Sequence, residues 1–427
     1  MRKRVIPAIL LLIFLVCLTT AALAINTGGQ SIVTVTNTPK PTRTPKPTRT
    51  PKPTAVPAEP GETTPPTASP TPKPTATPKP TPTPEPTIPP LENRADRLTI
   101  TLTGRIGLGD SNRWNTQARS LTAVQAGKPD DWLFGGLAPV FLYDDLTLSV
   151  LSMPLCEQEQ YTTSMATALI APPDSVRFLS GGGIDAVCLA GEHVGDYGTA
   201  GYKRTQEVLK AADIPSCGTF ETKQGDSFDE LLIWKCKDIR VGVLGYSKPD
   251  ERKIPEMLER IRLLREHACD IVIVSLDWTG TNTGVVSNEQ VNIAEALIEG
   301  SADAVWGHGS NELMPMYWCA GKPVMISAGT LCDGYSGAVD VFTCCFTLTY
   351  DISGETPALC EVRVLPVKAG ARGDYRPQIL EIEKNRQYAL SKLIGLNDRN
   401  HLKCLPREFT RSGILAVDPE GNASPVK

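Results

Sequence analysis

The sequence is poor in histidine, and its cysteines lack the spacing of common metal and redox motifs. Only four histidines occur in 427 residues, and none of the twelve cysteines forms a C-x-x-C pair. Neither a zinc knuckle nor a thioredoxin-like motif is therefore supported. Eleven cysteines follow the N-terminal apolar run, so they cannot all pair with one another. Cys188, Cys344 and Cys345 lie in apolar runs and are predicted to be buried thiols. One or two disulfides elsewhere remain compatible with export.

The folded part also lacks the positive charge typical of nucleic-acid binding. Residues 1–90 carry ten Lys/Arg against three Asp/Glu, whereas the remainder carries 33 against 44. The acidic remainder gives no reason to expect a nucleic acid as partner. The basic N-terminal part suits contact with anionic lipid headgroups or wall polymers, although its cations would also simply keep it solvated.

The N-terminus has the pattern of an export segment. Arg2, Lys3 and Arg4 precede an apolar run that extends to about residue 24. The small residues near the end of the run fit a cleavage site, while its length is close to the minimum for a spanning helix. Residues 1–25 are therefore predicted to be either a signal peptide or a membrane anchor. Both alternatives place the protein outside the cytoplasm, secreted or tethered to the membrane through its N-terminus.

A proline- and threonine-rich segment follows, and residues 26–94 are predicted to be an extended linker. Proline fixes its own backbone and has no amide hydrogen, so residues 34–90 are expected to form neither helix nor sheet. Fully extended, this stalk would reach roughly 170 Å. Such a spacer suits a protein that crosses a cell wall.

From residue 95 the pattern alternates between strands and helices. This alternation predicts a layered α/β fold with a largely parallel sheet. The alternating run 97–104 and the run 145–152 predict half-buried strands, whereas the continuous apolar run 184–190 predicts a strand covered on both faces. Further strands are expected at 239–247, 270–276, 302–308 and 322–329, and helices at 199–212, 254–268 and from a capping box at Ser287 and Gln290 to Gly300.

The α/β domain is expected to end near residue 370. Residues 371–427 are predicted to form an exposed helical segment over 377–396 and then a loose tail. Neither part carries a chemical motif.

Polar side chains follow several of the predicted strands. His193 follows the strand at 184–190 within "LAGEHVGDYG", Asp277 follows the strand at 270–276, and His308 ends the strand at 302–308. Active sites of parallel α/β sheets lie at the carboxyl ends of strands. We therefore expect these side chains to meet at one edge of the sheet.

The order of these motifs resembles the CapA family of poly-γ-glutamate capsule synthesis proteins, whose domain is related to calcineurin-like metallophosphatases. The resemblance covers roughly residues 97–366 and is strongest at 181–218, where His193, Asp196 and Gly198 keep the places of an Asn-Asn-His-x-x-Asp-x-Gly loop. It implies a metallophosphatase-like sandwich of buried sheets flanked by helices, preceded here by the disordered stalk. It also implies a metal site.

The residues that the family pattern uses for metal binding are largely replaced. Arg105 stands where the family has an aspartate, and Asp110 is too far along the chain to take its place. The other departures are Gly191-Glu192 for Asn-Asn, Ser152-Met153-Pro154 for Asn-Leu-Glu, Asp277-Trp278-Thr279 for His-Trp-Gly, Asn311 for the last histidine of Gly-His-x-Pro-His, and Thr330 for the asparagine of Ser-Leu-Gly-Asn-Phe. A metallophosphatase centre needs several converging ligands to activate water. No metal cofactor is therefore predicted, although a single divalent ion remains an alternative.

What remains is predicted to be a pocket without metal, formed by Arg105, Glu192, His193, Asp196, Asp277 and His308. The structural alternatives are also open: a His193–Asp196 pair that holds the loop, an ion pair of Arg105 with Glu192 or Asp277, a bond from His308 to the backbone, and a cap by Asp277 on the loop before Gly280.

Three functional hypotheses follow. In the first, the protein is a non-catalytic CapA-like domain of the cell envelope that binds an anionic capsule or wall polymer, or a partner protein, with Arg105 favouring an anionic group. In the second, it is an active hydrolase or transferase of poly-γ-glutamate metabolism, with His193 as general acid or base and Asp196 orienting it. In the third, it is a wall spacer with an inert cap.

Overall fold

The computed structural model describes residues 30–36, 91–165, 167–221, 225–280, 284–334, 341–402 and 405–426. The predicted signal peptide or anchor at 1–25 lies outside these ranges, as does most of the predicted linker. Within the ranges described, no helix is both long and apolar enough to cross a membrane.

The first of two packed β-sheets contains the strand that carries Arg105. Its parallel strands are β7 (Ser216–Glu221), β6 (Ala186–Cys188), β4 (Leu146–Leu151) and β2 (Arg97–Ile106), in that order. Beside β2 lie the short parallel strand β14 (Thr330–Cys332) and the antiparallel strand β15 (Phe342–Asp351). The sheet continues antiparallel through β16 (Ala358–Lys368) to β17 (Gln378–Ile379), β18 (Ile414–Val417) and β19 (Ala423–Pro425).

The second sheet carries Asp277 and His308. Strands β9 (Ile239–Ser247), β10 (Ile271–Asp277), β11 (Ala304–His308) and β13 (Lys322–Met325) are parallel. Antiparallel β12 (Met316–Cys319) lies at one end, and β8 (Ser227–Cys236) with β1 (Gln30–Thr36) at the other. Strand β7 pairs with β6 in the first sheet and with β8 in the second, so it links the two sheets.

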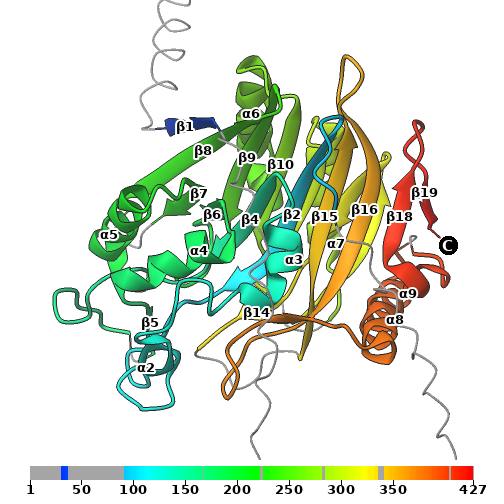
Figure 1. Ribbon diagram of the computed structural model, residues 1–427. Helices are drawn as coiled ribbons and strands as arrows, with labels where there is room; N and C mark the ends of the chain where they lie inside the picture. The colour runs from blue at the N-terminus through cyan, green and yellow to red at the C-terminus, as the bar shows by residue number, and fades with distance from the viewer. Residues whose placement is uncertain are drawn as a thin grey trace, which may run out of the picture.

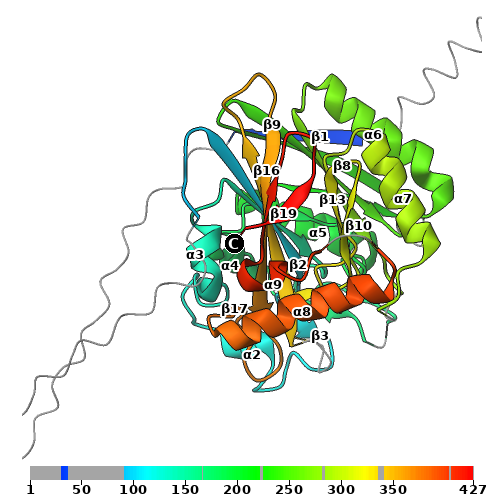
Figure 2. The same cartoon turned by 90° about the vertical axis from the view of Figure 1, so that its right-hand side faces the viewer.

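The main core lies between the sheets, and helices cover their outer faces (Figures 1 and 2). Helices α3 (Ala138–Phe141), α4 (Arg177–Gly182) and α5 (Gly198–Ala211) pack on the first sheet, and α6 (Ile254–Glu266) and α7 (Asn288–Glu299) on the second. Helix α8 (Glu383–Arg399) packs against β12 and β16, next to α9 (Phe409–Ser412). The predicted layered α/β sandwich of buried sheets flanked by helices is confirmed, but both sheets are mixed rather than largely parallel. The remaining short elements are α2 (Leu121–Gln125), β3 (Asp110–Ser111), β5 (Leu169–Ile170) and 3-10 turns at 135–137, 173–176 and 251–253.

The local signals for α5, α6 and α7 are confirmed. Helix α7 begins with both hydrogen bonds of the capping box, because the Ser287 hydroxyl accepts from the Gln290 amide and the Gln290 side chain accepts from the Ser287 amide. The helix ends before Gly300, as predicted. Its apolar stripe faces the second sheet, which gives this helix its stability through packing.

The prediction of half-buried strands is wrong for β2 and β4. Every residue of β4 is buried, as are all residues of β2 after Arg97. The polar positions face the helical layer or neighbouring strands, where hydroxyl groups bond to one another. Thr103 Oγ1 lies 2.7 Å from Ser149 Oγ, so burial leaves these groups satisfied.

The predicted linker and tail both contain strands of the sheets. Residues 30–36 form β1, which pairs in parallel with β8, so these residues are not part of an extended linker. Their sequence QSIVTVT is rich in β-branched residues and precedes the proline-rich run. The tail is likewise not loose, because β18 and β19 extend the first sheet beyond β16.

Two further predicted elements differ in extent or burial. Helix α8 is not exposed on all sides, since Leu390 and Leu393 join the core between the sheets. The strand predicted at 322–329 is shorter, because β13 ends at Met325 and the chain turns at Gly329 (φ +74°) into β14.

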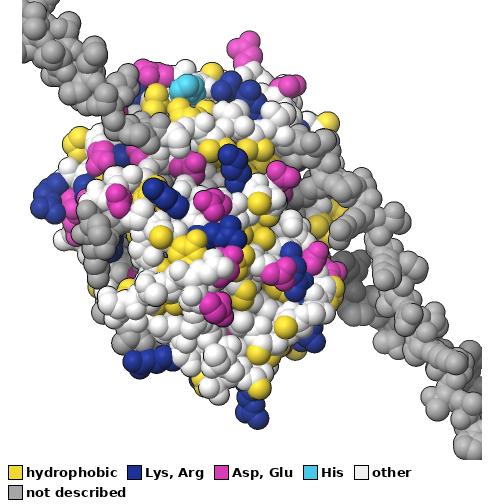
Figure 3. Space-filling model, turned by 90° about the vertical axis from the view of Figure 1, so that its left-hand side faces the viewer, with side chains coloured by type: hydrophobic (Ala, Val, Ile, Leu, Met, Phe, Trp, Pro, Cys, Tyr) yellow, Lys and Arg dark blue, Asp and Glu magenta, His cyan; other side chains and the backbone are white. Residues whose placement is uncertain are grey.

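The cysteines and the surface complete the description. No disulfide joins the ten cysteines within the described ranges, and Cys188, Cys344 and Cys345 are buried as predicted. Figure 3 shows one face of the molecule, on which the coloured cationic and anionic side chains are interspersed. That face therefore shows no single dominant sign of charge among its described residues.

Candidate functional site

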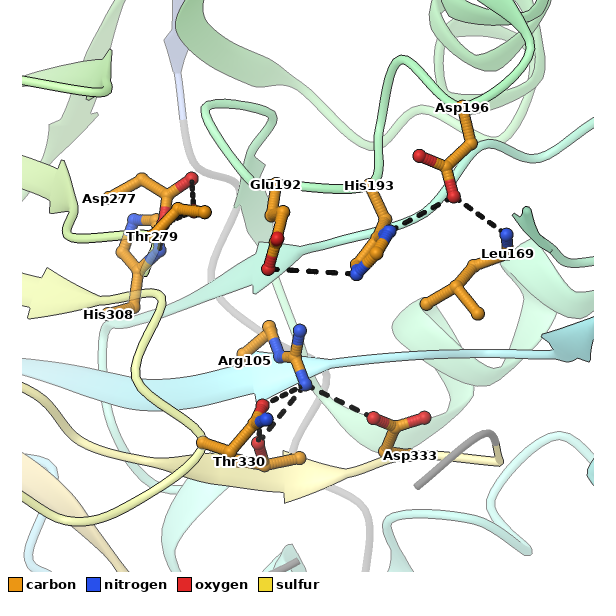
Figure 4. A network of polar contacts seen from close by, with 11 residues as sticks. Arg105, Leu169, Glu192, His193, Asp196, Asp277, Thr279, His308, Thr330 and Asp333 are labelled. Carbon is orange, nitrogen blue, oxygen red and sulfur yellow. Dashed lines mark hydrogen bonds and ion pairs between the residues drawn. The ribbon is translucent and has the colours of Figure 1, made fainter. Parts of the chain in front are cut away.

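The carboxyl ends of five strands bring the predicted polar residues to one edge of the sandwich. Asp277 and His308 face each other in register at the ends of β10 and β11, and Arg105 pairs in register with Thr330 of β14. The loop after β6 adds Glu192, His193 and Asp196. We call Arg105, Glu192, His193, Asp196, Asp277, His308 and Asp333 the strand-end group (Figure 4).

Arg105 forms an ion pair with Asp333, which the sequence pattern does not predict. Its Nη2 lies 3.2 Å from Asp333 Oδ2 and 3.5 Å from the Thr330 hydroxyl, and it donates to the Asn311 side-chain oxygen. Both residues of the ion pair are almost fully buried, at 5% and 2% exposure. The predicted pairing of Arg105 with Glu192 or Asp277 is therefore wrong. Asp333 follows β14 directly, and its place after a strand end is the signal that could have revealed it.

The loop after β6 is held by the predicted pair of His193 and Asp196. His193 Nδ1 lies 3.0 Å from Asp196 Oδ2, and the same oxygen accepts a hydrogen bond of 2.7 Å from the Leu169 amide. The other imidazole nitrogen, Nε2, lies 3.6 Å from Glu192 Oε2. Asp196 is buried, so it fixes the ring orientation and ties the loop to β5.

The surroundings of His193 favour its protonated form. Burial by itself lowers the pKa of the imidazole, but the hydrogen bond to Asp196 and the charges of Asp196 and Glu192 outweigh it. Arg105 opposes them weakly, and the net effect raises the pKa of His193 above its usual value. An imidazole oriented by a carboxylate in this way is suited to move a proton.

Asp277 and His308 form a second, fully buried pair. His308 Nδ1 lies 3.8 Å from Asp277 Oδ1, and His308 Nε2 lies 3.0 Å from the Ser275 hydroxyl. The predicted hydrogen bond from the His308 side chain to a backbone group is therefore wrong, because the ring bonds to the Ser275 hydroxyl. Asp277 accepts hydrogen bonds of 2.8 and 2.9 Å from the Thr279 hydroxyl at the start of the following loop. This contact agrees with the expected capping role of Asp277.

Close approach of the chain around Asp277 requires a glycine. Gly309 has φ +95°, and a Cβ atom there would lie 2.1 Å from Asp277 Oδ1. Burial raises the pKa of the Asp277 carboxyl, and the charge of Glu192 adds to this effect. His308 and Thr279 oppose it only partly. Asp277 is therefore a carboxyl whose charged form is disfavoured.

The side chains as placed do not fit the metal centre that the family pattern implies. Arg105 has five N–H donors and no acceptor, so it cannot ligate an ion. Throughout the described ranges, no three His, Cys, Asp or Glu side chains converge closely enough to hold one. Asp110 is also committed elsewhere, since it accepts from the amides of Leu121 and Thr122 at the start of α2.

A family model and several relatives agree with this architecture. The model for the bacterial capsule synthesis protein family PGA_cap matches residues 99–335. The chain belongs to this family. The match includes every member of the strand-end group, so the PGA_cap scaffold is present even though Arg105 replaces an expected ligand.

The relatives in this family are distant. The chain is 21% identical to the capsule biosynthesis protein CapA of Bacillus anthracis over 70% of this chain and 74% of that protein. It is 27% identical to a probable polyglutamine synthesis accessory protein of Mycobacterium tuberculosis, over 39% of this chain and about half of that protein (49%). The PGA biosynthesis protein CapA of Bacillus subtilis is 22% identical over 55% of this chain and 63% of that protein.

Among solved structures, the sulfate thiohydrolase SoxB of Thermus thermophilus in complex with glycerol aligns with a TM-score of 0.34 and 12% identity. The alignment covers 74% of this chain and 62% of that chain.

The strand-end group is more acidic than the sequence pattern predicts. Four carboxylates, those of Glu192, Asp196, Asp277 and Asp333, surround the single guanidinium of Arg105 (Figure 4). Because Asp333 already pairs with Arg105, the expectation that Arg105 favours an anionic ligand here is not supported. Two clefts of the described surface, of about 830 and 330 Å³, are lined by other residues.

Proposed function

We propose that this protein is a non-catalytic, cell-envelope member of the capsule synthesis family, which acts by binding an anionic polymer or a partner protein. One observation carries the proposal. Arg105 stands where the family pattern has a ligand, and its guanidinium binds Asp333, Asn311 and Thr330. The positive charge at this edge is thereby supplied by a side chain, which can neutralise Asp333 but cannot activate a water molecule.

The N-terminal sequence supports the place of action. An export segment followed by a proline-rich, basic stalk would tether the folded domain to the envelope and hold it within the wall. The names of the relatives from Bacillus anthracis and Bacillus subtilis also refer to capsule or polymer biosynthesis. We therefore propose an anionic polymer of the envelope, rather than a nucleic acid, as the partner.

Metal analysis of the full chain tests this proposal. The protein would be purified in detergent, supplied with Mn²⁺ and Zn²⁺, dialysed, and measured by elemental analysis. We expect far less than one ion per chain. The variant Arg105→Asp, which replaces the guanidinium by a carboxylate, is expected to take up more ion than the wild type. One tightly bound ion per wild-type chain would overturn the proposal.

The geometry of His193 favours a second candidate function. Its contact of 3.0 Å with Asp196 and its raised pKa suit a general acid or base in a hydrolase or transferase that acts on poly-γ-glutamate. Incubation of the full chain with this polymer, followed by size analysis and amine detection, separates the two functions. Turnover that disappears in His193→Ala while the fold is retained would establish the second candidate. No turnover in either protein agrees with the first.

A further inference from the structure

The cleft of about 830 Å³ lies outside the strand-end group and has an unusual lining. It is formed by α2, the segments directly before and after α2, and the loop that follows β16. Two tryptophans and four cationic side chains line it: Trp114, Trp132, Arg119, Lys128, Arg372 and Arg376. This composition combines flat apolar surfaces with positive charge.

The cleft is held in shape by contacts between its segments. The buried Tyr375 donates a hydrogen bond of 2.6 Å from its hydroxyl to the Arg119 carbonyl, which joins the loop after β16 to the loop before α2. The loop after β16 is also tied to the strand-end region, because the Asp333 amide donates to the Gly370 carbonyl at 3.1 Å. The cleft therefore belongs to the packed domain and needs little ordering before it can bind.

The charge of the cleft is opposite to that of the domain. Its one acidic side chain, Asp374, lies 3.0 Å from Arg376 Nε and 3.9 Å from Lys368 Nζ, so it is already compensated. Within the described part of the chain, no carboxylate forms an ion pair with Arg119, Lys128 or Arg372. Residues 91–427 as a whole carry 33 Lys/Arg against 44 Asp/Glu. A local excess of cations in an acidic domain indicates a site for an anion.

The tryptophans hold two of these cations in place. The Arg372 guanidinium carbon lies 4.0 Å from the centre of the Trp114 ring, and Lys128 Nζ lies 6.0 Å from the centre of the Trp132 ring. A ring face attracts a cation without neutralising its charge, so both cations remain able to pair with an anionic ligand. The partly buried rings and Val124 offer apolar surface between the charged groups.

This alternation of charge and apolar surface selects the chemistry of the ligand. Guanidinium groups match carboxylates in a bidentate geometry, and ring faces favour aliphatic stems. A polyphosphate chain has no such stems and would leave the tryptophans unused. A single small anion would engage only one or two of the cations.

We propose that this cleft binds an extended chain that bears carboxylates on short aliphatic stems, which is an acidic polypeptide of glutamate type. The inference rests on the proposed binding function, and it locates the anion-binding surface away from the acidic strand-end group. Carboxylates along the chain pair with Arg119, Lys128 and Arg372, while the methylene groups lie against Trp132 and Val124.

Binding of fluorescently labelled poly-L-glutamate to the full chain in detergent tests the inference, with anisotropy as the readout. We expect saturable binding that weakens with salt, and a loss of affinity of about tenfold or more in the double variant Lys128→Glu/Arg372→Glu. The matched control is Lys203→Glu/Lys210→Glu, which makes the same change in net charge at exposed positions of α5 and is expected to change affinity less than about twofold. Trp132→Ala is expected to weaken the binding that remains at high salt. Thermal unfolding verifies that each variant is folded, and Arg372→Gln replaces the double variant if that protein does not fold.

Three outcomes would overturn the inference. These are no saturable binding of polyglutamate by the wild type, an equal loss of affinity in the control variant, or tighter binding of polyphosphate that does not depend on Trp132. The same measurement with poly-γ-glutamate, which carries the same carboxylates, shows whether affinity depends on the linkage between the glutamate residues. Failure here leaves the metal and turnover tests of the proposed function untouched, because those concern Arg105 and His193.

Discussion

The guanidinium of Arg105 lies 3.2 Å from the carboxylate of Asp333 at the buried edge where β2 meets β14. Neither group can be rehydrated without opening the sandwich, so the ion pair supplies part of the compensation for the burial of each charge. A buried ion pair of this kind contributes little over an apolar pair of the same shape, but removal of one partner is costly. The pair therefore locks this edge in one arrangement.

Replacement of Arg105 by Met is expected to lower the free energy of unfolding by about 3 kcal/mol, because Asp333 loses its cation while it stays buried. Urea denaturation measures the loss. The control is Arg252→Met, which removes an exposed pair with Asp250 and is expected to cost far less than Arg105→Met. Equal losses in the two variants would show that the Arg105 pair is not the structural lock we describe.

The free energy of unfolding of the Asp277→Asn variant, relative to that of the wild type, is expected to increase as pH rises. Since burial raises the pKa of Asp277, this group contributes stability below its unfolded pKa of about 4 and loses that contribution as pH rises through its folded pKa. Urea denaturation of both proteins between pH 4 and pH 8 measures the difference. In Asp418→Asn the sign should be opposite and the change should fall at and below about pH 4, so this control extends to pH 3, because hydrogen bonds from Asn422 lower the pKa of this exposed carboxyl. A wild-type advantage over Asp277→Asn that grows with pH would contradict the assignment.

The pair of His193 and Asp196 is expected to stabilise the protein mainly at low pH. The raised pKa of His193 means that its contribution is fully present below the unfolded pKa of about 6.5 and is lost as pH rises through the folded pKa. The difference in unfolding free energy between wild type and His193→Gln should therefore shrink as pH rises from 5.5 to 8.5. In an Asp196→Asn background most of this pH dependence should disappear. Its persistence there would assign the effect to another group.

Strand β1 is expected to contribute to stability although it lies in a segment with the composition of a linker. Val33 packs against the core between the sheets, whereas the side chain of Thr34 is exposed. Val33→Asp is therefore expected to cost about 1–3 kcal/mol and Thr34→Asp less than about 1 kcal/mol. Thermal and urea unfolding of both variants check this, and the same small loss in both would show that β1 does not anchor the domain.

The periodic elements were predictable because their signals are local. The apolar stripes of α6 and α7 and the capping box at Ser287 and Gln290 act within a few residues, so the structure reproduces them. Burial of β2 and β4 was not predictable, since their alternating pattern does not reveal that helices cover the outer face. The same holds for β1 and β18, whose pairing partners β8 and β16 lie far away along the chain.

The sequence by itself determined the layered α/β fold, the strand ends at which the polar residues gather, and the replacement of an expected ligand by Arg105. The order of the strands in the sheets and the paths of the loops then decided which of these polar side chains are in contact. Asp333 reaches Arg105 because β14 runs beside β2, and two segments far apart in the chain, around α2 and after β16, line the cleft with four cations. Contacts of this kind depend on distances between segments that no local pattern encodes, so only the tertiary structure could specify them.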